Sequence, residues 1–387
     1  MPDPRFVCTV KANGQDFKSW KSITIKRDFN DMISWFQMAC SEGGPLGGAG
    51  DSRRLVPGTP VTISLGVQLV LTGAVTTRAA SFDANSHDVL IAGRSATADG
   101  PESAMPLHPG DFKGYTAEQA ARGALQPHGI DLVVKNPPAS WSKPFPFLAA
   151  NPGERVGEFM ERIFKMRGAF AWDDENGKIC VGQGDPSAAT VAELQEGRNI
   201  LRATFKLDDQ MLFGSLSFVG QQPGQGDDMA IRTSQATTQN PGVRQNRTRL
   251  EHAEMNGDSQ DMASRANIEA AQSAWPSVEA SVTVVGWFRP DGKLWGLTDN
   301  VSVYSPMGLP NSTGKMTLGV QSVTFSQDGE SGTTTTMELK KPELLTSTPF
   351  ANVQTDGKGG YGDGSGTPAP AAPVTPDYQG PAGIGHA

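Results

Sequence analysis

The chain has 387 residues, a formal net charge of −8 at pH 7 and only 19% charged residues. This acidic balance argues against a protein that grips nucleic acid through its phosphates, although nucleic acid could still slide past it. Glycine (45 residues) and proline (28 residues) are abundant, which favours turns and short strands over long helices. The three cysteines, Cys8, Cys40 and Cys180, are too sparse for a disulfide framework or a CxxC metal clip.

The sequence predicts neither a signal peptide nor a membrane-spanning segment. Residues 1–14 contain no basic stretch followed by an apolar run. The most apolar window, 61–75, is interrupted by Gly66, Gln68 and Gly73, and it is too short to cross a bilayer. We therefore expect a chain that is made soluble in a reducing cytoplasm.

Residues 1–98 are expected to form a first small antiparallel β-barrel domain. Apolar and polar residues alternate in several short runs, which is the pattern of half-buried strands. Gly66 is expected to form the turn of a hairpin, and Gly73 is expected to separate its second strand from a third. The predicted strands cover 22–26, 61–65, 67–71, 74–78 and 89–92.

Residues 99–196 are expected to form an α+β insert domain. Thr116 and Gln119 make a capping box that opens a helix, which ends before Pro127. A short strand is predicted over 130–134.

A second helix of this insert is predicted over 152–167, with Asn151 as its N-cap and Gly168 as its C-terminal stop. Its apolar residues recur at helical spacing, so one face of the helix should be buried. The strands 169–172 and 178–181 should then form a hairpin. This order of elements is typical of a compact α+β unit.

Residues 197–345 are expected to form a second β-barrel domain with one helix over 259–274, and 221–249 is interpreted as a long polar loop. Residues 346–387 are rich in glycine and proline and are expected to be a disordered tail. The fold class is therefore α+β and mainly β. The strands predicted in the second barrel cover 201–207, 214–219, 278–285, 301–304, 318–326 and 333–339.

A search for reactive groups predicts no catalytic, cofactor-binding or metal-binding residue. Residues 357–362 match GxGxxG but follow no predicted strand and open no helix, as a dinucleotide site requires. The carboxylates of 173–175 and 227–228 lie in glycine-flanked turns, where solvated hairpin tips are expected. The histidines lack ligand spacing for zinc; they are His87, His108, His128, His252 and His386.

Two further groups of residues favour structural roles. Arg244, Arg247 and Arg249 cluster in the predicted polar loop, where a subunit interface or plain solvation is preferred over an anion site. Most of the seven tryptophans are expected in cores, whereas Trp35 is expected in a core or a subunit contact.

An ordered series of short motifs resembles the Mu-like phage baseplate hub proteins, which belong with the late-control D proteins of contractile tails and the hub part of type VI secretion spikes. The chain departs from the family at Gly100–Ser103, and the tail beyond residue 346 has no counterpart in it. The motifs are the hairpin 57–75, the turn 81–87, 92–95 with Asp99, 116–121, 129–130, 144–147, 152–154, 167–168, 176–177, 199–201, 294–295, Asn300 and 332–333.

The resemblance implies a structural, non-enzymatic protein without a cofactor or a small-molecule substrate. It implies a homotrimer in which two similar barrels per subunit give a pseudo-sixfold ring, joining the tail tube protein to the central spike protein while DNA passes through. Other baseplate proteins are further implied partners. The implied location is the baseplate of the virion, assembled in the host cytoplasm.

Two alternatives stay open from the sequence. One is a hub with cell-wall hydrolase activity that uses Asp173 and Asp174. The other is a peptidoglycan-binding protein built on residues 151–181.

Overall fold

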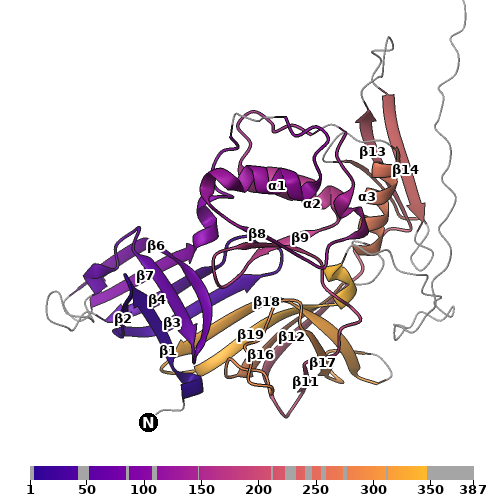
Figure 1. Ribbon diagram of the computed structural model, residues 1–387. Coiled ribbons are helices and arrows are strands. Elements are labelled where there is room, and N and C mark those ends of the chain that lie inside the picture. The colour runs from indigo at the N-terminus through magenta and orange to yellow at the C-terminus, as the bar shows by residue number, and fades with distance from the viewer. Residues whose placement is uncertain are drawn as a thin grey trace, which may run out of the picture.

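One large sheet dominates the computed structural model. Within the described residues this sheet has 13 strands, and two three-stranded sheets and three α-helices lie beside it (Figure 1). The expected class, α+β and mainly β, is confirmed at this level. The structure describes residues 4–41, 52–83, 87–106, 111–146, 148–210, 212–222, 232–239, 246–253, 259–272, 277–310 and 313–346.

The first half of the large sheet comes from the N-terminal residues. Apolar side chains alternate along its strands, as in Pro60–Leu65, where Val61, Ile63 and Leu65 are buried. The strands lie in the order β3-β4-β7-β6-β5-β1-β2. Their bounds are β1 Cys8–Ala12, β2 Gln15–Phe17, β3 Trp20–Asp28, β4 Trp35–Ser41, β5 Pro60–Leu65, β6 Gln68–Phe82 and β7 His87–Ser95.

The strand break predicted at Gly73 is wrong, because β6 runs through it without interruption. The first part of β6 pairs with β5 and the second part with β7, and Gly73 pairs with Val61 on one side and Ser95 on the other. A Cβ atom on Gly73 would lie only 1.9 Å from the carbonyl oxygen of Arg94. The glycine is thus required by the close approach of two strands and not by a turn.

The second half of the large sheet comes from the C-terminal part of the chain and lies in the order β12-β16-β19-β18-β17-β11. All six strands predicted from 201 onward are present, but Gly214–Val219 belongs to a separate sheet and β11 was not predicted. The bounds are β11 Ala192–Gln195, β12 Ile200–Asp208, β16 Ser277–Val285, β17 Asn300–Tyr304, β18 Lys315–Asp328 and β19 Gly332–Lys340.

The two halves meet edge to edge through an antiparallel ladder between β3 and β18. The ladder runs from the pair Ile23 and Gln327 to the pair Asp28 and Ser322. The buried apolar residues of both halves form one continuous core. Among the described strands the ladders join the halves and do not close either into a separate barrel. Closure of the two barrels, and the domain bounds 1–98, 99–196, 197–345 and 346–387, stay predictions.

Two helices, α1 (Ala117–Leu125) and α2 (Val156–Arg167), pack with a small sheet above the centre of the large one (Figure 1). The predicted capping box is confirmed. The side chain of Thr116 accepts from the N–H of Gln119, and the side-chain oxygen of Gln119 accepts from the N–H of Thr116. The small sheet has the order β8-β10-β9, with β8 Leu132–Lys135, β9 Phe170–Asp173 and β10 Ile179–Gly182.

The second helix begins four residues later than predicted. Gly153 adopts a positive φ of 79°, so the chain turns where the prediction placed the first helical residues. Glu154 is buried and its carboxylate accepts from the backbone N–H of Asn151 at 2.7 Å, ahead of the helix. Arg162 holds the same carboxylate at 2.8 Å. The Pro-Gly pair therefore forms a turn that precedes α2.

The polar segment predicted as a long loop, 221–249, contains most of a third sheet. This sheet has the order β14-β13-β15 and is covered by α3 (Ser259–Gln272), which confirms the helix predicted over 259–274. The strands are β13 Ser215–Gln222, β14 Arg232–Gln239 and β15 Thr248–His252. Because β14 reads RTSQATTQ, it carries almost no apolar alternation from which a strand could be predicted. We call β13–β15 with α3 the side module.

Buried charges join the side module to the α1/α2 unit. Arg167, at the end of α2, is fully buried and its Nη1 lies 3.2 Å from Oδ1 of Asp261 on α3. The Nζ of Lys143 lies 2.7 Å from the same oxygen, and the Arg167 guanidinium stacks on the ring of Phe145 at 3.8 Å. Removing one partner of such a group leaves an uncompensated buried charge.

The close approach at Gly73 makes a prediction about stability. Substitution Gly73→Ala should lower the free energy of unfolding by about 2 kcal/mol or more, because the new Cβ would collide with the backbone of β7. Urea unfolding followed by circular dichroism measures the change. Gly329→Ala is the matched control, since a Cβ there meets nothing within 4 Å. Equal effects of the two substitutions would contradict the role given to Gly73.

Candidate assembly surfaces

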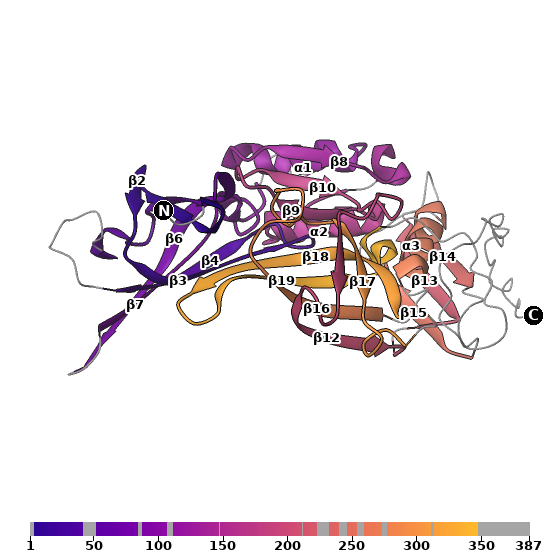
Figure 2. The ribbon, with the colours of Figure 1, turned by 90° about the horizontal axis from the view of Figure 1, so that it is seen from below.

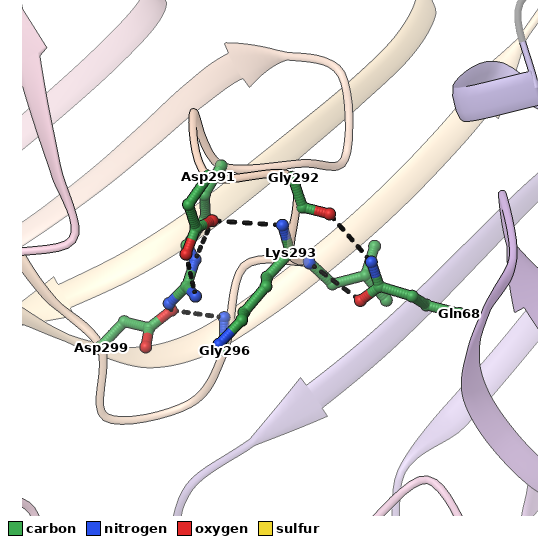
Figure 3. Close-up of polar contacts among 8 residues, drawn as sticks. Gln68, Asp291, Gly292, Lys293, Gly296 and Asp299 are labelled. Carbon is green, nitrogen blue, oxygen red and sulfur yellow. Dashed lines mark hydrogen bonds and ion pairs between the residues drawn. The ribbon is translucent and has the colours of Figure 1, made fainter.

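The two halves of the large sheet are held together a second time by Gln68, at the start of β6 (Figure 3). Its Nε2 donates to the carbonyl oxygen of Gly292 at 2.9 Å, and its Oε1 accepts from the backbone N–H of Leu294 at 3.3 Å. Both partners lie in the segment between β16 and β17. The side-chain amide of Gln68 therefore makes two hydrogen bonds with the backbone of the other half.

Ion pairs shape the segment that receives Gln68. Arg289 lies 2.8 Å from a carboxylate oxygen of Asp291 and 2.8 Å from one of Asp299. Asp299 also accepts from the N–H of Gly296 at 2.8 Å. Burial raises the pKa of Asp299, and the Gly296 N–H and Arg289 oppose this rise. These contacts brace the segment to which Gln68 binds.

At the outer end of the second half, β12 pairs with β16 and with no other described strand. A groove of about 530 Å³ follows β12 and is bounded on its other side by residues 305–310. Apolar side chains stand exposed at this groove, with Leu201 58% and Met307 89% exposed. The ring of Phe205 lies against Gly308, where an added Cβ would come within 2.1 Å of it. A partly apolar groove beside an unpaired strand edge favours association with another strand.

At the end of the first half, β6 and β7 extend as an arm formed by residues 76–82 and 87–91. Beyond Val75, β6 pairs with β7 and with no other strand in the described part of the chain. Phe82 is 81% exposed and stacks on the ring of His87, with 6.0 Å between ring centroids. The β6–β7 arm projects on the side of the first half, away from β12 (Figure 2). The molecule therefore has an unpaired strand edge at each end.

Asp173 is not the solvated turn residue that the sequence predicted. It is 1% exposed and accepts from the N–H of Ser34 at 3.1 Å and from its hydroxyl at 2.6 Å. Its carbonyl oxygen accepts from Arg27 at 2.8 Å. Burial raises the pKa of Asp173, and Arg27 and Ser34 oppose the rise. The prediction failed because the hairpin turn begins only after β9, which fixes Asp173 against the first half of the sheet.

Asp174 lies in the turn itself and serves the backbone. Its Oδ1 accepts from the N–H groups of Asn176 and Lys178 at 2.9 and 2.8 Å. Asp173 and Asp174 therefore have different environments, and neither arrangement offers a pair of carboxylates that face one substrate.

The arginines of the predicted loop are engaged within the side module. The guanidinium groups of Arg247 and Arg249 lie 5.3 and 5.2 Å from the ring centroid of Phe213. Arg247 donates to the carbonyl oxygen of Asp209 at 2.9 Å, and Arg249 pairs with Glu251. This replaces the expectation of plain solvation for these two. Predicted features outside the described residues are His108, Arg244, Trp275, 227–228, 357–362 and 347–387 of the tail.

The core prediction is confirmed for Trp141, Trp172, Trp287 and Trp295, which are buried, whereas Trp20 is partly buried against the core. Trp35 is 38% exposed and does not lie in a core, so a subunit contact stays a prediction for it. In the described ranges no group of three or more His, Cys, Asp or Glu side chains is placed to hold a metal ion. Across the same ranges, the helices are all too short or too polar to cross a bilayer.

The burial of Asp173 predicts a pH-dependent contribution to stability. Because the folded state raises its pKa, native protein binds the proton more tightly than the unfolded chain, and the stability that this proton adds is lost as the pH rises through the folded pKa. The stability of the wild type relative to Asp173→Asn should therefore fall as the pH rises above the ordinary carboxyl pKa of 3.8. Urea unfolding measures it, and Glu175→Gln controls for the loss of a carboxylate from the same hairpin. A relative stability that rises with pH would contradict the assignment.

Comparison with known proteins agrees with this architecture. The family model of the Mu phage baseplate assembly protein GpP-like, N-terminal, matches residues 7–95. The model of the baseplate hub protein gp44-like, second domain, matches residues 97–183. The baseplate hub protein gp44 of Escherichia phage Mu is 27% identical over 293 residues, covering 74% of this chain and 76% of that protein.

Solved structures share the fold. The 43 kDa tail protein of prophage MuSo2 from Shewanella oneidensis has a TM-score of 0.71 at 22% identity, covering 88% of this chain and 99% of that one. The tail protein from Neisseria meningitidis MC58 has a TM-score of 0.70 at 21% identity, covering 88% and 98%. Two hub-domain models match in sequence order and the fold is shared over most of the chain, so the chain is similar in sequence and in fold to the baseplate hub proteins of Mu-like phages.

Proposed function

We propose that this protein is the structural baseplate hub of a contractile phage tail, and that three copies form a pseudo-sixfold ring which joins the tail tube to the central spike. The observation that carries the proposal is the large sheet. It contains two halves with one strand order, joined edge to edge, and an unpaired strand edge at each end. The similarity of the chain to phage baseplate hub proteins supports the hub role.

A head-to-tail contact between unlike surfaces closes into a ring when the rotation between copies divides a full turn. The β12 edge and the β6–β7 arm are unlike surfaces at different ends of one molecule, so they suit such a contact. With two similar halves in each of three subunits, a closed ring presents six similar units. This number fits a sixfold tube on one face and a threefold spike on the other.

The acidic chain suits a conduit for DNA. A net charge of −8 per subunit disfavours phosphate binding on a shared inner wall, so DNA would pass without being held. The proposed partners are therefore the tube protein, the spike protein and other baseplate proteins in the virion. The work is geometric and calls for no cofactor and no small-molecule substrate.

The hydrolase alternative gains no support from Asp173, because a buried carboxylate that is hydrogen-bonded to Ser34 cannot reach a cell-wall polymer. Substitution of Asp173 would also disturb the fold. An activity assay on the unmodified protein with purified peptidoglycan is therefore the proper test of that alternative.

The ring predicts the size and the shape of the purified protein. Light scattering after gel filtration should give about three times the chain mass of 41.0 kDa. Negative-stain images should show a threefold ring with a central hole. A stable monomer at micromolar concentration, or turnover of peptidoglycan, would overturn the proposal.

A further inference from the structure

The two halves of the large sheet repeat one another strand by strand. Taken along the chain, β1, β3, β4, β5, β6 and β7 correspond to β11, β12, β16, β17, β18 and β19, and corresponding strands have corresponding neighbours. One difference is that β1 runs antiparallel to β5 whereas β11 runs parallel to β17. The shared order makes each strand of one half comparable with one strand of the other.

A bulge aligns β3 with β12 residue by residue. The ladder of β3 with β4 skips one residue between Trp20 and Ser22, and the ladder of β12 with β16 skips one between Ile200 and Arg202. Trp20 therefore corresponds to Ile200. The sequences WKSITIKRD and ILRATFKLD then share residues at Thr24 and Thr204, Lys26 and Lys206, and Asp28 and Asp208.

A second bulge aligns β6 with β18. The ladder of β6 with β7 skips one residue between Val75 and Thr77, and the ladder of β18 with β19 skips one between Val320 and Ser322. Val75 therefore corresponds to Val320, and the β6 strand of the β6–β7 arm corresponds to the part of β18 that pairs with β3.

The backbone around these two valines confirms the alignment. The N–H of Val75 donates to the carbonyl oxygen of Thr59 and that of Val320 to Asp299, both at 2.9 Å. In return Val75 accepts from the N–H of Gly58 and Val320 from that of Thr298, both at 2.8 Å. Gly58 and Thr298 both have a positive φ, of 89° and 65°. An unusual backbone conformation is thus repeated at the same place.

Comparison of the two halves shows which pairing is missing at each unpaired strand edge. Inside the subunit β3 pairs with β18, and their residues Ile23, Ile25 and Phe325 are buried. Their equivalents are β12 and β6, which pair with no described strand at the corresponding edges. The equivalents are also more exposed: Ala203 and Phe205 are half-buried and Ala80 is exposed.

The geometry points to an intersubunit ladder in which β12 of one copy pairs antiparallel with the β6 strand of the β6–β7 arm of the next copy, in the register of the ladder between β3 and β18. This inference rests on the proposed ring and identifies the strands that would close it. The alignment sets the opposed residues as Thr77 with Asp208, Arg78 with Leu207, Ala79 with Lys206, Ala80 with Phe205, Ser81 with Thr204 and Phe82 with Ala203.

Side-chain volumes suit this register. Large and small side chains alternate across it, since Phe82 faces Ala203 and Ala80 faces Phe205. Phe82 would lie on the same face as Phe205, where residues 305–310 bound the groove. The most exposed aromatic ring of the arm would therefore enter the groove beside β12, and the pairing would cover both unpaired edges.

Cysteine cross-linking tests the register. In the double variant Ala79→Cys with Lys206→Cys, the thiols oppose each other across the proposed ladder, and mild oxidation should give covalent dimers and trimers on a non-reducing gel. The bands should collapse to the 41.0 kDa monomer with a reductant. The native cysteines add little background, since Cys40 and Cys180 are buried and burial raises the pKa of Cys8 to about 12.

Two matched variants control the experiment. Lys26→Cys with Thr324→Cys places thiols at the equivalent pair inside the subunit, and it should form an internal disulfide without covalent oligomers. Ala80→Cys with Lys206→Cys shifts the register by one residue and puts the thiols on opposite faces of the ladder, so it should cross-link at least about tenfold less.

The outcomes separate the inference from the proposed function. If light scattering gives a trimer and the internal control forms its disulfide, but the Ala79→Cys, Lys206→Cys variant gives no covalent oligomer, the register is wrong while the ring stands. Equal cross-linking by the shifted variant also overturns the register. If the protein is monomeric by scattering, the proposed function itself fails.

Discussion

The architecture depends on the ladder between β3 and β18. Backbone N–H and C=O groups at the edge of a sheet need partners, and in this chain the edge of the first half is satisfied by the second half. The pairing joins segments about 300 residues apart in the sequence and lets both halves share one core. Without it, each half would expose a strand edge and one side of its apolar interior. The hydrogen bonds of Gln68 add a second contact between the halves, at a different position.

Buried polar side chains hold the α1/α2 unit and the side module in place beside this sheet. Asp173 binds the backbone and side chain of Ser34 and so fastens β9 to the first half. Arg167 and Asp261 fasten the side module to the end of α2. Each of these side chains is costly to bury without its partner, which makes each contact specific for one arrangement. Apolar packing supplies the cores, and the buried polar pairs determine how those cores are oriented.

The sequence was informative wherever apolar periodicity or capping chemistry acts locally. Alternation predicted β5, β16 and β19, and the capping box at Thr116 predicted the start of α1. It was silent where a tertiary contact decides the structure. Gly73 was predicted as a strand break because the strand that requires a glycine there, β7, lies about 20 residues later in the sequence. The polar strand β14 forms because α3 covers its sheet, and Asp173 is buried by Ser34, about 140 residues earlier. The unpaired edges were equally hidden, since an edge strand and a central strand can carry the same alternation.

The side module interrupts only one of the two halves. It is inserted between β12 and β16, whereas the corresponding strands β3 and β4 are joined by a short connection. The two halves are thus equivalent in their strand order, but only the second half carries the side module. A partner that recognised the strands of a half would therefore meet two similar surfaces on each chain. A partner that recognised the side module would meet one.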